Sequence, residues 1–200
     1  MEDEPDAAVI AASLVVPARF GAIFDRHATV LHRYLVRRLG PDEGESLVGE
    51  VFRIAFEKRH TYDLTRPGAR PWLYGIASNL VAKHRRREAR RLRATARLAG
   101  RRLVPDDLAD RVSGALDATD RWNRVAEAVA ALPEVERDAL LLHAWEGLAY
   151  DDIAAAQGVP VGTVRSRLHR ARGRLRELAA ADGGEGDENI DSRDPGRIGS

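Results

Sequence analysis

The stretch from Leu148 to Arg176 (LAYDDIAAAQGVPVGTVRSRLHRARGRLR) places the strongest constraint on how this chain folds. Residues 151–157 carry enough small apolar side chains for a short helix. Gly158 is expected to end it, because glycine readily adopts the left-handed backbone found at helix C-termini. Pro160 disfavours a helical residue before it and presets the backbone for a new helix. The stretch therefore predicts two helices joined by a tight turn.

The second of these helices has one apolar side and one basic, polar side. The apolar residues recur at helical spacing: Val161, Val164, Leu168, Ala171, Leu175 and Leu178. The opposite side carries Thr163, Ser166 and Arg170, with Gly162 and His169 beside them and Arg165 and Arg167 at its flanks. Such a face suits a DNA major groove, where arginine can bond guanine through two hydrogen bonds. The pattern is typical of a helix-turn-helix whose second helix contacts bases.

A packed helical hairpin with a merely solvated basic face is the alternative interpretation of the same stretch. Six arginines stand between Arg165 and Arg176, with no acid among them. A solvated face usually mixes charges of both signs. The one-sided charge therefore favours a polyanionic partner.

Charge is strongly segregated along the chain, although the formal net charge is only +1. Residues 83–102 hold ten basic residues against one acid, and residues 181–200 hold six acids against two arginines. Such segregation favours electrostatic partners. The chain has no cysteine, no apolar run long enough for a bilayer, and an acidic N-terminus unlike a signal peptide. We expect a cytoplasmic protein without a membrane segment.

The sequence gives little support for a metal site, a cofactor site or a catalytic site. The histidines lack the spacing of metal ligands, and Asp151-Asp152 is better explained as favourable charge at a helix N-terminus than as a metal site. No nucleophile elbow, phosphate loop or dinucleotide-binding glycine pattern occurs. We therefore expect no metal, no cofactor and no enzymatic activity.

The periodicity predicts an all-α protein of two small helical domains joined by a flexible linker. Helical apolar spacing covers residues 18–39, 43–60 and 72–93, with a break at Gly40-Pro41 and a loop at residues 61–70. The predicted organisation is a mobile leader (1–17), a first domain (18–93), a linker (94–120), a second domain (121–180) and a disordered acidic tail (181–200).

Both domains resemble one known family. Leu132-Pro133, Glu136-Arg137, Gly158-Val159-Pro160 and the run GTVRSRL at 162–168 resemble region 4 of the extracytoplasmic-function (ECF) sigma factors of bacterial RNA polymerase. Residues 20–91 are similar to region 2 of that family, through Tyr34-Leu35, ESLV at 45–48, EVF at 50–52 and WLYGIASNL at 72–80. The two regions stand in the family's order, with its linker between them.

The resemblance implies a sigma factor that binds core RNA polymerase and promoter DNA. Region 2 would dock on the β′ clamp helices and help open the minus-ten element. Region 4 would bind the β flap and read the minus-thirty-five element. Many family members are also held by an anti-sigma factor, and no residue here identifies one.

The resemblance also implies roles for particular residues, carried over by position. The minus-thirty-five contacts would be Thr163, Arg165, Ser166, Arg167, His169 and Arg170. The minus-ten contacts would be Asn79, Lys83, Arg86 and Arg87, with the loop at 61–70 helping to choose a flipped base. The clamp-binding residues would be Glu45, Val48, Glu50 and Phe52.

The chain departs from the family at four positions in region 2. Ser46 and Gly49 stand where an aspartate and a glutamine are common, and Gly75 and Ser78 stand where arginines are common. Two other functions remain open: a stand-alone helix-turn-helix regulator, or a module whose main partner is another protein. A simple regulator has no need for a Trp-Leu-Tyr helix ending in Asn79 and a polycation, which favours the sigma factor.

Overall fold

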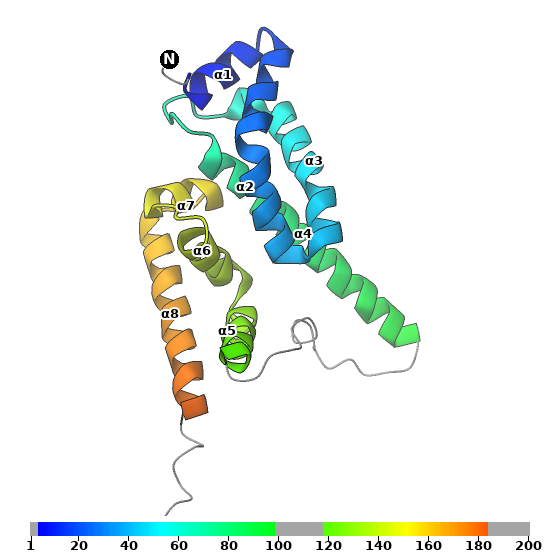
Figure 1. Ribbon diagram of the computed structural model, residues 1–200, viewed down its shortest axis with the longest axis vertical. Helices are drawn as coiled ribbons and strands as arrows, with labels where there is room; N and C mark the ends of the chain where they lie inside the picture. The colour runs from blue at the N-terminus through cyan, green and yellow to red at the C-terminus, as the bar shows by residue number, and fades with distance from the viewer. Residues whose placement is uncertain (1–3, 99–117, 184–200) are drawn as a thin grey trace, which may run out of the picture.

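The regular structure of this chain is entirely helical in a computed structural model that describes residues 4–98 and 118–183 (Figure 1). The all-α prediction is confirmed for these residues. A first group comprises α1 (Asp6–Ser13), a 3₁₀ turn (Pro17–Phe20), α2 (Gly21–Leu39), α3 (Pro41–Lys58), a second 3₁₀ turn (Arg59–Thr61) and α4 (Arg70–Leu98). A second group comprises α5 (Ala118–Ala131), α6 (Glu134–Ala144), α7 (Tyr150–Gln157) and α8 (Val161–Gly183).

Helices α2 and α3 form an antiparallel hairpin at the centre of the first group. Gly40 turns the chain with a φ of 92°, and Pro41 starts α3 with the backbone that a first helical turn needs. Gly44 lies so close to α2 that a Cβ there would stand 2.6 Å from Val36 Cα. A glycine is therefore needed for the two helices to pack at this distance.

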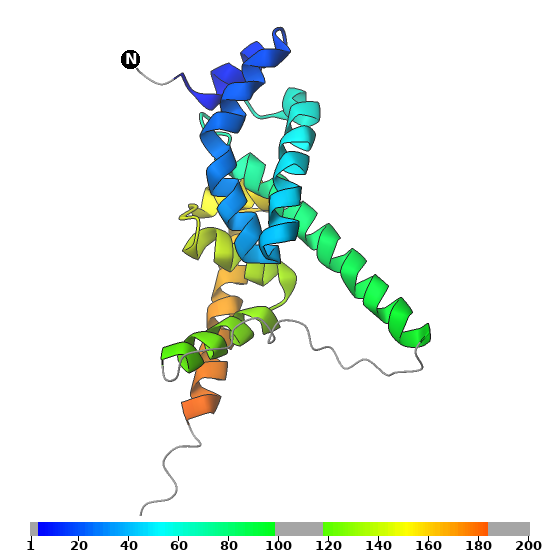
Figure 2. The same ribbon diagram turned by 45° about the vertical axis from the view of Figure 1, so that its right-hand side comes forward.

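Helix α4 crosses this hairpin with its first half and leaves it with its second half (Figures 1 and 2). The first half supplies Leu73, Tyr74, Ala77 and Val81, none of which is measurably exposed. The hairpin contributes the remaining core: Ile23, Leu31, Tyr34, Leu35, Val51 and Ala55. The second half is mostly basic and projects away from the hairpin, and its Leu92 is 40% exposed.

The N-terminal segment is ordered, so the prediction of a mobile leader over residues 1–17 is wrong where the structure describes it. Helix α1 buries Val9 and Ile10 in the core, at 1% and 0% exposure. The carboxylate of Asp6 accepts hydrogen bonds from Arg26, His27 and the backbone N–H of Ala69. The segment is held by two apolar side chains and one buried acid, too few to produce a helical pattern in the sequence.

The predicted helix-turn-helix is present in α7 and α8. Gly158 adopts the left-handed conformation, with φ 62° and ψ 37°. The N–H of Val159 donates to the Ala154 carbonyl at 3.0 Å, which closes the end of α7. The Pro160 carbonyl then accepts the N–H groups of Thr163 and Val164, which starts α8. Glycine and proline therefore act here as the sequence predicted.

Several boundaries differ from the sequence prediction. Helix α4 continues to Leu98 and α5 begins at Ala118, so residues 99–117 of the expected linker lie outside the described residues. Helix α8 ends at Gly183, and the rest of the expected acidic tail also lies outside them. Across residues 4–98 and 118–183, no helix combines the length and apolar character that crossing a membrane requires.

The two groups of helices are in direct contact. Helix α7 packs against α4, and α6 also approaches it, an arrangement visible in both ribbon views (Figures 1 and 2). The buried apolar residues form one continuous cluster that runs from α1 into α7 and α8. The sequence pattern predicted both groups of helices but gave no sign of the contact between them.

Candidate nucleic-acid interface

Helix α8 is fixed by its apolar side and presents its polar side to solvent. Val164, Leu168 and Ala171 are at most 1% exposed and pack on α6 and α7. Arg165 and His169 are exposed on the other side, and neither has a hydrogen bond or ion pair with another described residue. Cationic and polar groups without internal partners on a rigid helix are available for a DNA groove.

The remaining predicted α8 contacts are engaged within the protein. Ser166 Oγ donates to the Thr163 carbonyl at 2.9 Å, and both residues are partly exposed. Arg167 Nη1 donates to Gln157 Oε1 at 2.7 Å, which ties α8 back to α7. This bond fixes the Arg167 guanidinium on the edge of the face rather than at its centre.

Arg170 lies at the boundary between α8 and α6. Its Nε donates to Glu136 Oε1 at 2.8 Å, and Arg174 Nη1 donates to Oε2 of the same carboxylate at 3.0 Å. The Glu136 side chain is only 6% exposed, whereas those of Arg170 and Arg174 are about half exposed. The sequence placed Arg170 among the minus-thirty-five contacts, and the structure gives it an ion pair within the protein as well. Glu136 itself was not among the predicted site residues, and only its place in the family motif singled it out.

A second basic face lies along α4. Asn79, Lys83, Arg86 and Arg87 are all exposed, and their spacing of three to four residues places them on one side of the helix. The structure therefore brings together all four residues predicted for the minus-ten contact. The face begins where α4 leaves the core and continues onto its projecting half.

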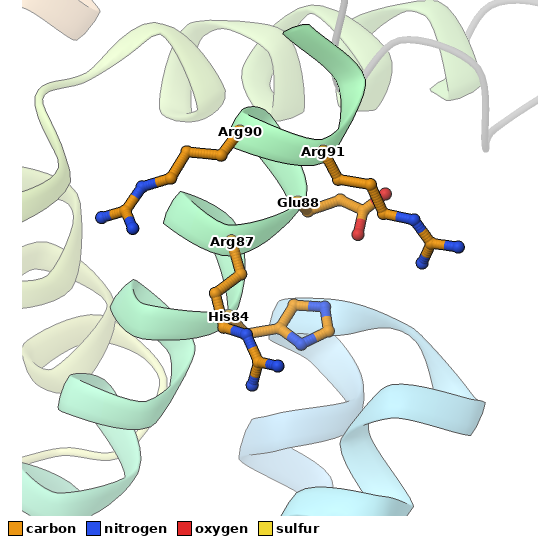
Figure 3. A pocket seen from close by; sticks show the side chains of 5 residues that line it. All are labelled: His84, Arg87, Glu88, Arg90 and Arg91. Atoms are coloured by element: carbon orange, nitrogen blue, oxygen red, sulfur yellow. The ribbon is translucent and has the colours of Figure 1, made fainter. Parts of the chain in front are cut away.

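A shallow hollow on this projecting half is lined mostly by cations. Figure 3 shows the side chain of Arg90 extending to one side of α4, Arg87 running down beside His84, and Arg91 lying near Glu88. His84 completes the lining. Anions such as backbone phosphates suit a surface of this charge.

Arg85 does not belong to this basic face, although the sequence shows an unbroken basic run around it. Its Nη2 donates to the Arg38 carbonyl at 3.0 Å, and the residue is partly buried. Burial, together with the nearby cations Arg137 and Arg38, lowers the pKa of Arg85 to about 10. Helical spacing alone does not reveal which side of α4 another domain covers.

The residues predicted to bind the polymerase clamp do not share one face of α3. Glu45, Val48 and Phe52 lie on one side, but Glu50 points away and pairs with Arg53 at 2.7 Å. Phe52 is only 6% exposed, and its ring lies 4.8 Å from that of Phe24. Phe24 is 45% exposed, so it offers more apolar surface here than Phe52 does. Phe24 falls within the apolar spacing over residues 18–39, but periodicity does not measure how deeply a side chain is buried.

The loop at 61–70 is shaped by internal hydrogen bonds. Tyr62 Oη donates to the Arg66 carbonyl at 2.7 Å, and Asp63 Oδ1 accepts from the N–H and hydroxyl of Thr65. Asp6 Oδ2 accepts the N–H of Ala69 at 2.9 Å, which anchors the loop's end to α1. These bonds restrain the backbone that leads into α4.

Two of the family departures are buried. Ser78 is 8% exposed and lies in hydrogen-bond contact with the Tyr34 hydroxyl at 3.0 Å. A Cβ at Gly75 would stand 2.5 Å from the Ala156 carbonyl oxygen on α7. An arginine at position 75 would have no room while α7 lies against α4, and an arginine at position 78 would replace a buried side chain beside Tyr34. Ser46 and Gly49, in contrast, are exposed on α3.

The fold and its two basic faces define a two-part helical protein of the nucleic-acid-binding class. Residues 23–91 match the family model described as Sigma-70 region 2, and residues 122–175 match the one described as Sigma-70, region 4. The chain belongs to the ECF sigma factors of RNA polymerase.

Relatives of known sequence and structure agree with this assignment. The chain is 31% identical over 172 residues to the ECF RNA polymerase sigma factor SigL of Mycobacterium tuberculosis, covering 85% of this chain and 94% of SigL. It is 40% identical over 117 residues to SigC of the same species, covering 58% of this chain and 60% of SigC.

Two solved structures share the fold. The sigma factor RpoE, in complex with the anti-sigma factor NepR from Bartonella quintana, superposes with a TM-score of 0.57 at 26% identity, over 82% of this chain and 98% of RpoE. CnrH, in complex with the cytosolic domain of CnrY, gives a TM-score of 0.59 at 25% identity, over 88% of this chain and 98% of CnrH.

Proposed function

We propose that this chain binds core RNA polymerase and directs promoter-specific initiation, with region 4 reading the minus-thirty-five element and region 2 recognising and melting the minus-ten element. The observation that carries the proposal is the presence of two exposed basic faces, one on α8 and one on α4, in a single chain of this family. We also infer that it works in the cytoplasm, as a binding subunit rather than an enzyme.

The α8 face supports a contact with the major groove. Arg165 and His169 would approach base edges, since neither is engaged with another described residue. Thr163, Ser166 and Arg167 lie at the edges of the face, where phosphate contacts fix the helix in register. Arg170 keeps part of its guanidinium exposed beside Glu136 and would contact phosphate rather than a base.

The α4 face supports contact with melted DNA. Flipping a base out of the stack costs a few kcal/mol, which a polar pocket and nearby cations can offset. Asn79 would hold the flipped base, and Lys83, Arg86 and Arg87 would bind the phosphates of the separated strand. The anchored loop at 61–70 would form one wall of that site.

The surface of α3 supports a contact with the polymerase clamp. Glu45 and Val48 lie on the same side of α3 as Phe52, whose ring packs against the exposed ring of Phe24 on α2. Region 4 would contact the β flap. An anti-sigma factor is a further proposed partner, because both structural relatives were solved with such a protein or with a cytosolic partner domain.

Binding to purified core polymerase tests this proposal against a stand-alone regulator. We expect the protein to co-migrate with core polymerase in gel filtration, and the complex, rather than the free protein, to retain promoter DNA. The variant Phe24→Ala should weaken the complex, whereas Arg19→Ala, which removes an exposed ion pair with Glu4, should not. Specific DNA binding by the free protein without any polymerase association would instead identify a regulator.

A further inference from the structure

One buried acid on α6, Glu136, holds two of the arginines on α8. Its side chain is 6% exposed, and its Oε1 accepts a hydrogen bond from Arg170 Nε while its Oε2 accepts one from Arg174 Nη1. The two arginines stand four residues apart, so they lie on the same side of the helix. Because each carboxylate oxygen has its own arginine, the carboxylate is held in one orientation.

The bond to Glu136 leaves the outer edge of the Arg170 guanidinium available. This planar group is bonded through Nε, whereas Nη1 and Nη2 have no partner among the described residues. These two nitrogens lie on the far side of the group from the Arg170 side-chain stem and can donate two parallel hydrogen bonds to one phosphate. Half of the side chain is exposed, so a phosphate can reach that edge. Glu136 thus fixes the plane of a phosphate-binding group.

Arg170 lies on the side of α8 that carries the other predicted groove contacts. Thr163, Ser166 and Arg170 follow one another at spacings of three and four residues, which places them along one side of the helix. Arg165 is exposed as well, but no acid holds it. The helix therefore presents one free arginine and one fixed arginine. A free arginine can adapt to a base edge, whereas a fixed one meets the DNA backbone in a single register.

Stability of the fold does not account for the acid at this position. Helix α8 is already packed through Val164, Leu168 and Ala171, which are at most 1% exposed. Ion pairs to arginines that are about half exposed contribute little to stability, because water screens them. The negative charge also weakens the attraction of this surface for DNA. What the acid can improve is the accuracy of binding, because it restricts how Arg170 meets the DNA.

We propose that Glu136 is a specificity-determining residue, which positions Arg170 for one backbone phosphate beside the minus-thirty-five element and so raises the ratio of specific to non-specific DNA binding. In the correct register, the Arg170 guanidinium neutralises both the phosphate and the Glu136 carboxylate. In another register, the phosphate lacks this guanidinium and is repelled by the carboxylate. The effect on DNA rests on the proposed sigma function, whereas the pairing of Glu136 with Arg170 is a property of the chain alone.

Nuclear magnetic resonance of the full chain tests the positioning without polymerase or DNA. The variant Arg170→Lys removes the Nε–H signal of Arg170 and so identifies it. We expect this proton to exchange with water more slowly than that of Arg165, because it is bonded to a carboxylate. In Glu136→Ala the difference in exchange rate should disappear, while the other arginine signals stay in place. Equal exchange rates in the unaltered chain would overturn the proposal.

DNA binding by the complex with core polymerase tests the effect on specificity. The two probes are a duplex with a cognate promoter and the same duplex with a scrambled minus-thirty-five element. Glu136→Ala should lower the ratio of the two affinities by about three- to tenfold, because an arginine side chain must then be ordered on binding. Affinity for the scrambled duplex should not fall, since a negative charge has been removed. An unchanged ratio would refute the role in specificity.

A double variant shows whether Glu136 acts through Arg170. In a chain that already carries Arg170→Ala, Glu136→Ala should not change the ratio further, because the side chain that it positions is absent. A further fall would show that Glu136 acts by another route and would overturn the proposal. Arg170→Ala should also lower the slope of log affinity against log salt by about one, since one phosphate contact is lost. An unchanged slope would exclude the phosphate contact.

Glu177→Ala is the matched control for the change in charge. Glu177 is exposed on α8, and its side chain has no hydrogen bond or ion pair with another described residue. Its removal should tighten binding to both duplexes alike and leave the ratio unchanged. A fall as large as that of Glu136→Ala would assign the effect to charge alone. If the unaltered chain gave core polymerase no preference for the cognate duplex, the proposed function would fail, while slow exchange at Arg170 would still establish the pairing with Glu136.

Discussion

At the scale of single residues, buried acids organise the molecule and exposed cations are left for binding. Glu136 holds Arg170 and Arg174 on α8, and Asp6 holds α1 against the loop at 61–70. Arg165 and His169 have no such partner among the described residues. Whether an arginine on α8 is held within the fold therefore depends on which acid lies nearby.

The stability of the N-terminal segment depends on the charge of Asp6. We expect Asp6→Asn to lower the free energy of unfolding by about 2–3 kcal/mol at neutral pH, because a buried ion pair loses one partner. Urea denaturation measures this change. Asp63→Asn, which alters an exposed carboxylate with its own turn bonds, should leave the denaturation midpoint unchanged.

The effect of Asp6→Asn on the free energy of unfolding should also depend on pH. Hydrogen bonds from His27, Ala69 and Arg26 outweigh the effect of burial and hold the pKa of Asp6 well below its usual value of 3.8. A carboxylate with a depressed pKa stabilises the fold above its ordinary pKa and loses this effect as the pH falls below it. The difference in free energy of unfolding between the original protein and Asp6→Asn should therefore become smaller below about pH 4. A difference in unfolding free energy that stayed constant down to pH 2 would contradict this prediction.

Arg165 provides the sharpest test of the α8 face. We expect Arg165→Ala to weaken recognition of a cognate promoter by about 1–3 kcal/mol, measured by run-off transcription on promoter variants. The loss should depend on one base position of the minus-thirty-five element. The unfolding midpoint should not change, because the side chain has no described partner. A uniform loss on every promoter variant would reassign Arg165 to a phosphate contact.

At the scale of elements, the sequence predicts helices well wherever an apolar face repeats. The helix-turn-helix followed from Gly158, Pro160 and the stripe on α8, because each acts through local backbone geometry. Helix α1 was missed because its few apolar residues form no helical pattern, and their burial depends on the core that they enter. The depth of Arg85 and Phe24 could not be predicted for a related reason: spacing gives direction around a helix, but neighbouring elements decide how deeply a side chain is buried.

Two glycines of the helix-turn-helix should have opposite effects on stability when each is replaced by alanine. Gly158→Ala forces a side chain into the left-handed region at φ 62° and should destabilise the second group by about 1 kcal/mol. Gly173→Ala, in the middle of α8 with nothing within 4 Å of the added methyl group, should stabilise it by about 0.5–1 kcal/mol. Thermal unfolding of the two variants measures both. Equal shifts in one direction would show that helix propensity alone governs this region.

At the scale of the whole molecule, the two groups of helices lie against each other, and each keeps a basic face exposed to solvent. The core runs continuously from α1 to α8, but the contact through Glu146 and Asp138 is polar and leaves buried guanidinium nitrogens unsatisfied. The sequence could not predict this contact, since its residues are about a hundred positions apart. Gly75 was noted only as a departure from the family, and the structure explains it by the close approach of Ala156 on α7.

The central claim is that this chain gives core RNA polymerase its choice of promoter, and run-off transcription on genomic fragments tests it most directly. Core polymerase with the purified protein should yield transcripts of defined length from a small set of fragments, and core polymerase alone should yield none. These transcripts should disappear with Asn79→Ala and Arg165→Ala combined, while Arg19→Ala leaves them intact. No defined transcript from any fragment, with the protein stably bound to core polymerase, would contradict the account.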